Sequence, residues 1–343
     1  MGALGVCFDP GWFSTPEDEL PKMRAAGATW IRVVLKPDRV HQRLFMKAHE
    51  LGMKVLAVHT IASDFESGFS TSVARYRERY KNLIDIYAVG NEPDQDPSAA
   101  ESSDIMAPVD LSARILQARR LLPDIPLCAA GFSSGQPEWL RRVAAAALAC
   151  LDYIDFHAYG RWPGEAPVLA SNGDAWGFGP VGPLIAGYAA YGKPLIVSEY
   201  GAPADELLNP GRYMSEMTAK LGSDPRIAVA TAFTWRGVAG FYFNDQDGAP
   251  TVYLDAFRAG AEMAKKLALA KTAAAPDKPV TGEAQMPEDT FVIDPETRVY
   301  IAALGWTPRS DYVVAGGGGY VLCTEGQVWY INSDGTYQSY PKA

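Results

Sequence analysis

The sequence predicts an α/β protein, a (β/α)8 TIM barrel followed by a small C-terminal all-β module. Short apolar segments alternate with helix-like segments through residues 1–275, and eight of the apolar segments have the length of a strand. Eight strand–helix units occupy about 250 residues in proteins that close into such a barrel. A doubly wound open sheet is the alternative, but no GxGxxG sequence follows the first strand, and eight repeats favour closure.

The predicted strands are short and mostly apolar along their whole length, and several are rich in β-branched residues. They cover residues 4–8, 29–35, 54–60, 84–90, 126–131, 153–159, 194–200 and 228–235. A sheet with one face in water would show alternating apolar and polar residues. Continuous apolar strands instead indicate a parallel sheet that is covered on both faces.

The segments between the strands have the signals of helices. Residues 16–27 follow Thr15, a candidate N-cap, carry acidic residues in their first turn and end in glycine. Residues 109–122 and 137–150 have the same helical character, and residues 251–275 are expected to form the closing helix. Strands that alternate with helices in this way are typical of parallel βαβ units.

The character of the sequence changes after the predicted barrel. Residues 276–289 are rich in proline and charge and are expected to form a linker. Residues 290–343 contain short strand-like pieces separated by glycine-rich turns, which predict a β-rich module. A module of about 55 residues is near the lower size limit for a domain that folds alone. Carbohydrate binding, oligomerisation and packing on the barrel all stay open as its role.

Composition and charge narrow the classes of partner. The chain of 343 residues is 48% hydrophobic and 21% charged, which is the composition of a globular protein with a sizeable core. Its formal net charge of −9 and pI of about 5.1 argue against nucleic acid or an anionic membrane as the main partner. No apolar run approaches the length of a membrane span. Oligomeric state is not predicted.

The N-terminal sequence MGALGVCFDPGW has no basic region followed by a long apolar stretch, so no signal peptide is expected within this sequence. A secreted protein whose signal has been removed, a cytoplasmic protein and a phage-associated protein all stay open. The four cysteines form no CxxC pair, and buried free thiols are favoured over a disulfide or a metal site.

Polar and aromatic side chains stand near the predicted C-terminal ends of the strands, where the active site of a parallel barrel lies. They are Arg32, His59, Asn91, Glu92, His157, Tyr159, Glu199 and Trp235. In the sequence IDIYAVGNEPDQ, residues 84–95, Glu92 follows an apolar run directly, and Pro93 then turns the chain out of the barrel. We expect these side chains to converge on one pocket.

Two carboxylates in one pocket indicate a particular chemistry. Burying both costs free energy through desolvation and like-charge repulsion, so such a pair needs a reason. Cleavage of a glycosidic bond uses two carboxylates with separated pKa values. One stays protonated and gives its proton to the leaving oxygen, and the other stays ionised and attacks the anomeric carbon. Glu92 and Glu199 therefore form a candidate catalytic pair.

The motifs GNEP at residues 90–93 and SEYG at residues 198–201 resemble those of the retaining glycoside hydrolases built on (β/α)8 barrels. That clan includes cellulase-like, mannanase-like, xylosidase-like and β-galactosidase-like families, and the resemblance covers about residues 4–262. It implies that Glu92 is the acid/base and that Glu199 is the nucleophile. The C-terminal module lies outside the resemblance.

The resemblance also implies roles for residues beside this pair. Asn91 would hydrogen-bond the sugar 2-hydroxyl, and Arg32 would hold the nucleophile in its ionised form. His157 and Tyr159, in the sequence DFHAYG, resemble the His-x-Tyr pair that lines the catalytic subsite. We therefore expect all four to bind or face the substrate.

Aromatic residues are expected to complete the substrate site. Trp235, in FTWRG, resembles the tryptophan that forms the floor of the catalytic subsite, where the apolar face of a sugar can stack. His59 matches less specifically. Trp162 and Trp176 lie in the long stretch of residues 160–180 after the sixth strand, the best candidate for a cleft wall, with ordinary loop packing as an equal alternative.

The favoured interpretation is a metal-independent retaining glycoside hydrolase that acts on β-linked sugars and needs no cofactor. Glu199 attacks, Glu92 protonates the leaving oxygen, and a water that Glu92 deprotonates then releases the sugar. This mechanism predicts a carboxyl separation of about 5–5.5 Å. A transglycosylase with the same residues, and a non-catalytic glycan-binding or structural barrel of a cell-surface or phage assembly, are the alternatives. The sugar, the linkage and the choice between endo and exo cleavage are not predicted.

Overall fold

The chain divides into two compact units, Met1–Ala275 and Pro276–Ala343. The computed structural model describes residues 2–13, 15–37, 41–95, 105–129, 131–133, 136–159, 181–202, 207, 209–236, 243 and 251–274 of the first unit. In the second unit it describes the backbone of five strands. No helix in these parts of the chain is long and apolar enough to span a membrane.

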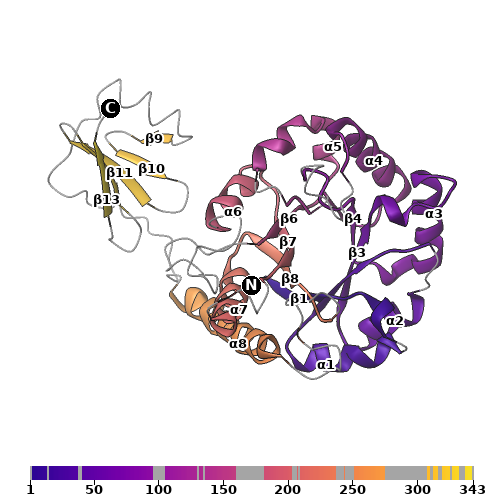
Figure 1. Ribbon diagram of the computed structural model, residues 1–343. Coiled ribbons are helices and arrows are strands. Elements are labelled where there is room, and N and C mark those ends of the chain that lie inside the picture. The colour runs from indigo at the N-terminus through magenta and orange to yellow at the C-terminus, as the bar shows by residue number, and fades with distance from the viewer. Residues whose placement is uncertain are drawn as a thin grey trace. The chain divides into compact units, whose positions relative to one another are not determined.

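Eight parallel strands form the centre of the first unit. They are β1 (Ala3–Cys7), β2 (Trp30–Val34), β3 (Lys54–His59), β4 (Ile86–Val89), β5 (Leu127–Ala129), β6 (Ile154–Ala158), β7 (Leu195–Tyr200) and β8 (Ile227–Ala232). Their order in the sheet is β5-β4-β3-β2-β1-β8-β7-β6. Parallel bridges from Cys128 to Tyr153 and from Phe132 to Phe156 join the two ends, so the sheet nearly closes into a barrel (Figure 1). Each strand overlaps its predicted range, and the eight-stranded parallel barrel is confirmed.

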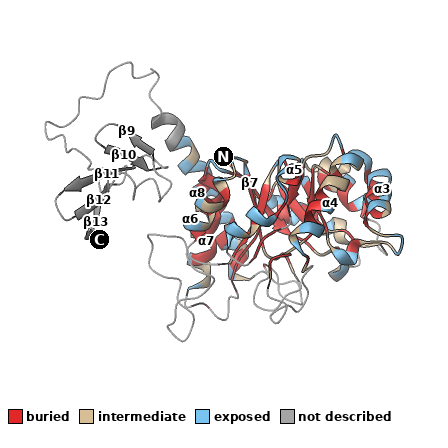
Figure 2. Cartoon of the chain, turned by 90° about the horizontal axis from the view of Figure 1, so that it is seen from above, coloured by how far each residue is buried: buried red, intermediate tan, exposed pale blue. Residues whose placement is uncertain are grey.

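Helices surround the strands (Figure 1) and turn their exposed faces outward (Figure 2). The α-helices are α1 (Leu20–Ala25), α2 (Gln42–Glu50), α3 (Phe69–Tyr80), α4 (Pro108–Leu121), α5 (Ala145–Ala149), α6 (Val181–Ala189), α7 (Pro210–Ser223) and α8 (Val252–Ala274). Short 3-10 helices are η1 (Pro10–Trp12), η2 (Pro16–Glu19), η3 (Ile61–Ser63), η4 (Lys81–Leu83) and η5 (Pro137–Arg142). In α2, the buried residues Leu44, Phe45 and Ala48 lie on one face, as the helical period requires.

The helix predicted over residues 137–150 is interrupted. The chain forms η5, leaves helical geometry at Val143 and Ala144, where ψ is 137° and 135°, and then begins α5. The backbone N–H of Ala144 donates to the Ser112 hydroxyl on α4 at 3.0 Å. This partner from a neighbouring helix replaces a hydrogen bond within the helix, and it is not visible in the local sequence.

The barrel has two apolar layers. The larger cluster of buried residues packs between the strands and the helices. A smaller, separate cluster contains Trp30, Leu56, Val58, Ile86, Ala88, Cys128, Ile196 and Val229, which come from alternate positions of the strands and therefore fill the barrel interior. On β2, Arg32 lies on the same inward face as Trp30, two residues nearer the C-terminal end of the strand. The interior is thus apolar toward the N-terminal ends of the strands and polar at their C-terminal ends, which form the mouth of the barrel.

The second unit contains β9 (Thr307–Arg309), β10 (Tyr312–Ala315), β11 (Gly319–Thr324), β12 (Gln327–Ile331) and β13 (Tyr337–Pro341). They pair antiparallel in this order, and the last four overlap strand-like pieces predicted from the sequence. The pieces predicted within residues 291–304 lie outside the described residues. The linker and the role of the module stay predictions.

Candidate active site

Glu92 leaves the end of β4 through an unusual backbone path. Gly90 has φ of 88°, and Glu92 itself has φ of 49°, in the left-handed region that costs a residue with a Cβ roughly 1–2 kcal/mol. The backbone N–H of Glu92 donates to the carbonyl oxygen of Gly131 at 3.0 Å, which fixes the turn. Strain held at a carboxylate residue is typical of a functional position.

Glu199 reaches the barrel mouth because β7 contains a bulge. Phe156 of β6 pairs with Val197, but the next residue, His157, pairs with Glu199. Ser198 is therefore the extra residue. Regular alternation would turn Glu199 away from the barrel interior, whereas one extra residue re-aims the side chain that follows it.

Arg32 on β2 contacts both Asn91, which follows β4, and Glu199 near the end of β7. Its Nη1 lies 2.8 Å from Oε1 of Glu199, and both side chains are at most 9% exposed. Its Nη2 donates to Oδ1 of Asn91 at 2.6 Å. A guanidinium presents several donors in a fixed plane, so one side chain orients the carboxylate and the amide together. Arg32, Asn91 and Glu199 converge as the sequence indicates.

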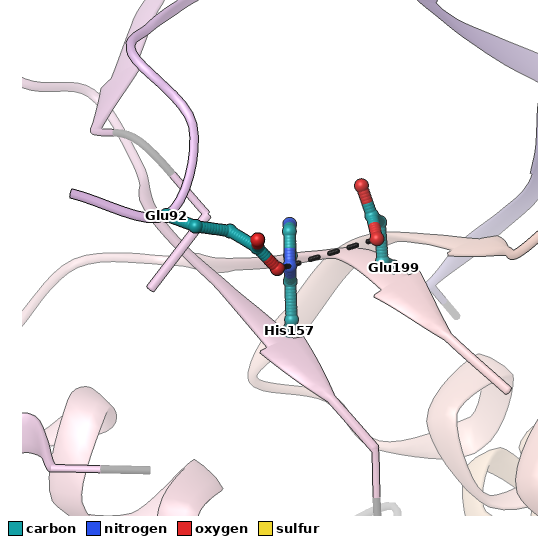
Figure 3. A group of neighbouring side chains, drawn as sticks. All are labelled: Glu92, His157 and Glu199. Atoms are coloured by element: carbon teal, nitrogen blue, oxygen red, sulfur yellow. Dashed lines mark hydrogen bonds and ion pairs between the residues drawn. The ribbon is translucent and has the colours of Figure 1, made fainter. Parts of the chain in front are cut away.

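His157 lies between the two glutamates (Figure 3). Its Nδ1 is 2.6 Å from Oε1 of Glu92 and 3.6 Å from Oε2 of Glu199. The second oxygen of Glu199 also accepts a hydrogen bond from the Tyr159 hydroxyl. The second oxygen of Glu92 accepts one from the Gln95 amide. Among the described residues, Glu92 thus has two side-chain partners, His157 and Gln95, and Glu199 has three, Arg32, His157 and Tyr159.

Neighbouring charges lower the pKa of Glu199 and raise the pKa of His157. Burial alone would raise the pKa of Glu199, but His157, Arg32 and the Tyr159 hydroxyl outweigh it, and the pKa lies below its ordinary value. Burial alone would lower the pKa of His157, but the carboxylates of Glu199 and Glu92 outweigh it and raise that pKa. Burial raises the pKa of Tyr159 well above its ordinary range, so the phenol remains a donor. The site favours an ionised Glu199.

Two further predicted site residues, His59 and Trp235, are described by the partners that they contact. His59 is fully buried, and its ring nitrogens contact the Tyr87 hydroxyl and, at 2.8 Å, Oδ1 of Asp64. Its ring packs against Phe69 and Tyr76, which places it on the helix side of β3. Both ring nitrogens of His59 thus have partners within the protein. The predicted contact of His59 with sugar stays a prediction.

Trp235 follows β8 and is only 1% exposed. Its indole N–H donates to Oε2 of Glu19 at 3.0 Å, and its ring meets Phe243 edge-on at a centroid distance of 5.9 Å. The role of Trp235 as a subsite floor stays a prediction. Trp162 and Trp176 lie outside the described residues.

Sequence reasoning missed two residues of the site, Gln95 and Gly131. Gln95 lies three positions after Glu92, and nothing in the acidic stretch around it distinguishes it from a solvated loop. Gly131 ends a predicted strand, and its signal is the absence of a side chain beside a site that is otherwise crowded. A methyl group at Gly131 would lie 2.1 Å from Nε2 of His157 and 2.9 Å from the Ser198 hydroxyl.

Gly131→Ala is expected to lower kcat by about 100-fold, because the new methyl group must displace the imidazole that contacts Glu92. Overpacking of this kind costs about 1–3 kcal/mol of stability. Gly187→Ala is the matched control, since its methyl group would meet Pro137 at 2.6 Å, away from the site. Kinetics and thermal melts of both variants check this: equal activity in the two would contradict it.

Arg32→Gln is expected to move the acidic limb of the pH profile of kcat/KM to higher pH by roughly 1–3 units. Arg32 is one of the charges that lower the pKa of Glu199, so its loss raises that pKa and delays ionisation to higher pH. Arg32→Lys keeps a positive charge and is expected to keep most of the limb in place. An unchanged limb in Arg32→Gln would show that another group controls it.

Glu92, His157 and Glu199 could also hold a metal ion, since each offers one ligand atom and these atoms lie within 4.8 Å of one another. The guanidinium of Arg32, 2.8 Å from Glu199, works against this because it would repel a second cation at the same carboxylate. The same three side chains suit proton transfer, because a hydrogen-bonded imidazole and carboxyl group can share one proton.

The comparisons with known proteins concern the fold. No family model matches the sequence, and no curated protein matches it. Solved structures of glycoside hydrolases do match. A variant of an endo-β-1,3-glucanase of glycoside hydrolase family 128, subgroup I, from Amycolatopsis mediterranei in complex with laminarihexaose is 17% identical, with a TM-score of 0.54 over 76% of this chain and 99% of that one.

Two further matches have different substrates in their names. The catalytic domain of a mannanase from Streptomyces sp. SirexAA-E is 16% identical, with a TM-score of 0.52 over 76% of this chain and 87% of that one. Xylanase 10B from Thermotoga petrophila RKU-1, in complex with xylobiose, is 15% identical, with a TM-score of 0.52 over 77% and 90%. The barrel thus has the fold of the (β/α)8-barrel glycoside hydrolases, as predicted. At these identities the likeness shows the fold alone.

Proposed function

We propose that the protein is a retaining glycoside hydrolase that cleaves β-glycosidic bonds of a poly- or oligosaccharide, with Glu92 as acid/base and Glu199 as nucleophile. The observation that carries the proposal is the separation of the two carboxylates, since one oxygen of each lies within 4.8 Å of the other. Retaining enzymes hold the two carboxyl groups about 5–5.5 Å apart and inverting enzymes about 6.5–9.5 Å, and a closest oxygen approach of this size agrees with the shorter arrangement. The short separation supports direct attack by a carboxylate.

In the first step, Oε2 or Oε1 of Glu199 attacks the anomeric carbon while the bond to the leaving oxygen breaks. Arg32 at 2.8 Å and the lowered pKa of Glu199 support its role as the ionised group. Glu92 gives its proton to the leaving oxygen. The 2.6 Å contact between Oε1 of Glu92 and Nδ1 of His157 supports this role, because a hydrogen-bonded imidazole can pass a proton to a carboxyl group.

In the second step, Glu92 accepts a proton from a water that attacks the glycosyl–enzyme ester. The sugar leaves with its original anomeric configuration, and Glu199 is ionised again. A transglycosylase would differ only in its acceptor, a sugar hydroxyl in place of water. A non-catalytic glycan-binding barrel has no need for two carboxylates held this close, because their burial and repulsion cost free energy without improving binding.

The substrate class is proposed from the structures that share the fold, which are named as enzymes acting on β-1,3-glucan, mannan and xylan. We therefore propose a β-linked polysaccharide.

The test is release of sugar from a panel of β-linked polysaccharides and aryl β-glycosides, with Glu199→Gln in parallel. Release by the wild type and none by the variant supports the proposal and identifies the substrate. Glycan binding by both proteins, with no release from any member of the panel, overturns it in favour of a binding module.

A further inference from the structure

The bulge at Ser198 is held by side chains from three other strands. A bulge residue is left out of the regular ladder, so its backbone groups need other partners. The N–H of Ser198 donates to Oδ1 of Asp155 on β6 at 3.1 Å. Its carbonyl oxygen accepts hydrogen bonds from the Thr231 hydroxyl on β8 and from the Cys7 thiol on β1, the latter at 3.2 Å. Both backbone groups of the bulge are therefore satisfied.

These partners lie in the barrel interior, away from the surface of the protein. Ser198 and Thr231 are fully buried, and Asp155 is 1% exposed. Asp155 and His157 are the two polar residues of β6, and Asp155 takes no part in the proposed chemistry. Burial raises its pKa to about 7, because the barrel interior disfavours the ionised form. This carboxyl group bonds the Ser198 N–H and is also attracted by the charges of His157 and Arg32, so it connects the bulge with the site.

The position of the bulge decides where the next side chain points. Ser198 precedes Glu199 directly, and regular pairing would return Glu199 to the outer face of the strand. At the observed position, Glu199 lies 2.8 Å from Arg32 and 3.6 Å from His157. A small rotation of the Ser198 peptide would change both distances at once, and a displacement of about 1 Å at a reacting group can lower a rate by about 100-fold.

We propose that Asp155 and Thr231 are positioning residues for the nucleophile: they hold the Ser198 bulge and, through it, aim the carboxylate of Glu199 into the barrel mouth. This inference rests on the proposed role of Glu199. Thr231 gives the cleaner test because Thr231→Val keeps the shape of the side chain and removes only the hydroxyl that reaches the Ser198 carbonyl.

The experiment compares Thr231→Val and Thr231→Ser with Thr218→Val. Thr218 is also fully buried, and its hydroxyl bonds the Tyr200 hydroxyl at 2.9 Å where α7 packs on β7, without contacting Ser198. Thr231→Val is expected to lower kcat by about 10-fold to 100-fold with KM changed by less than about twofold. Thr231→Ser restores the hydroxyl and is expected to recover kcat to within about threefold of the wild type. Thr218→Val is expected to lower the stability of the protein and to leave kcat and KM unchanged.

A second pair of variants tests the carboxyl group. Asp155→Asn keeps an oxygen that accepts from the Ser198 N–H, whereas Asp155→Ala removes it. The Ala variant is expected to fall in kcat at least as far as Thr231→Val, and the Asn variant to stay nearer the wild type. In the impaired variants the acidic limb of kcat/KM also moves to higher pH, because Glu199 no longer meets Arg32 at full contact. If Asp155 and Thr231 only stabilised the fold, the acidic limb of the pH profile of kcat/KM would not move.

The outcomes separate this inference from the function on which it rests. If the wild type is active, Glu199→Gln is inactive and Thr231→Val matches Thr218→Val in kcat and in pH profile, the positioning role is wrong and the proposed function stands. If the wild type releases no sugar, or Glu199→Gln stays active, the proposed function fails, and the inference fails with it.

Discussion

Glu199→Gln is expected to lower kcat by roughly 10⁴-fold on every substrate that the wild type cleaves. An amide oxygen is too weak a nucleophile to form the glycosyl–enzyme ester. Glycan binding is expected to survive, because the amide still offers an oxygen to Arg32. Steady-state kinetics and calorimetric titration with an oligosaccharide check both statements.

Glu216→Gln is the matched control for this prediction. Glu216 lies on α7, where it pairs with Arg212 at 2.6 Å in a contact that is largely exposed. The same change of a carboxylate to an amide is expected to leave kcat unchanged there. A Glu199→Gln variant that retains a tenth or more of the activity would mean that another group attacks the sugar.

Glu92→Ala is expected to show losses that depend on the leaving group. For substrates with poor leaving groups, such as polysaccharides, kcat/KM is expected to fall by about 10³-fold or more, because the leaving oxygen must be protonated as the bond breaks. For a dinitrophenyl glycoside the first step needs no proton, and the loss in kcat/KM is expected to be much smaller. Kinetics on a series of aryl glycosides measure this difference directly.

Azide distinguishes the two glutamates. In Glu92→Ala, azide attacks the glycosyl–enzyme from the side that Glu92 vacated, so the expected product is a β-glycosyl azide. In Glu199→Ala, azide replaces the nucleophile itself, and the expected product from an activated substrate is the α-glycosyl azide. Product configurations in the reverse assignment would exchange the two roles.

The barrel could be predicted from the sequence because its signals are local and repeated. Each of the eight strands is a short apolar run, and each lies between segments with helical character. The NEP and SEY sequences could be placed for the same reason, since each directly follows or ends one of these runs. In a parallel barrel the C-terminal ends of strands share one mouth, so sequence order was enough to bring Glu92, Glu199 and Arg32 together.

Details that depend on side-chain direction could not be predicted. An apolar strand such as β3 shows no alternation, so the sequence did not reveal that Leu56 and Val58 face inward and that His59 therefore faces the helices. The bulge at Ser198 changes which side chains of β7 face inward after it. It depends on partners from β1, β6 and β8 that lie far away in the chain.

Asp155 is the residue whose role the sequence could have revealed. It stands two positions before His157 on β6, so the period of two places both side chains on one face of the strand. A carboxyl residue in a mainly apolar run, on the same face as a predicted site residue, is a signal that can be used when strands are read from a sequence. The break between η5 and α5 had no such signal, because its partner Ser112 lies on another helix.

The most direct test of the central claim is to determine the anomeric configuration of the first sugar product. Proton NMR monitors it during cleavage of whichever panel substrate the wild type accepts. The separation of the two carboxylates predicts double displacement, so the newly formed reducing end should appear first as the β-anomer and only later equilibrate to the α-anomer. First appearance of the α-anomer would mean that water attacks directly, and it would contradict the assignment of Glu199 as the nucleophile.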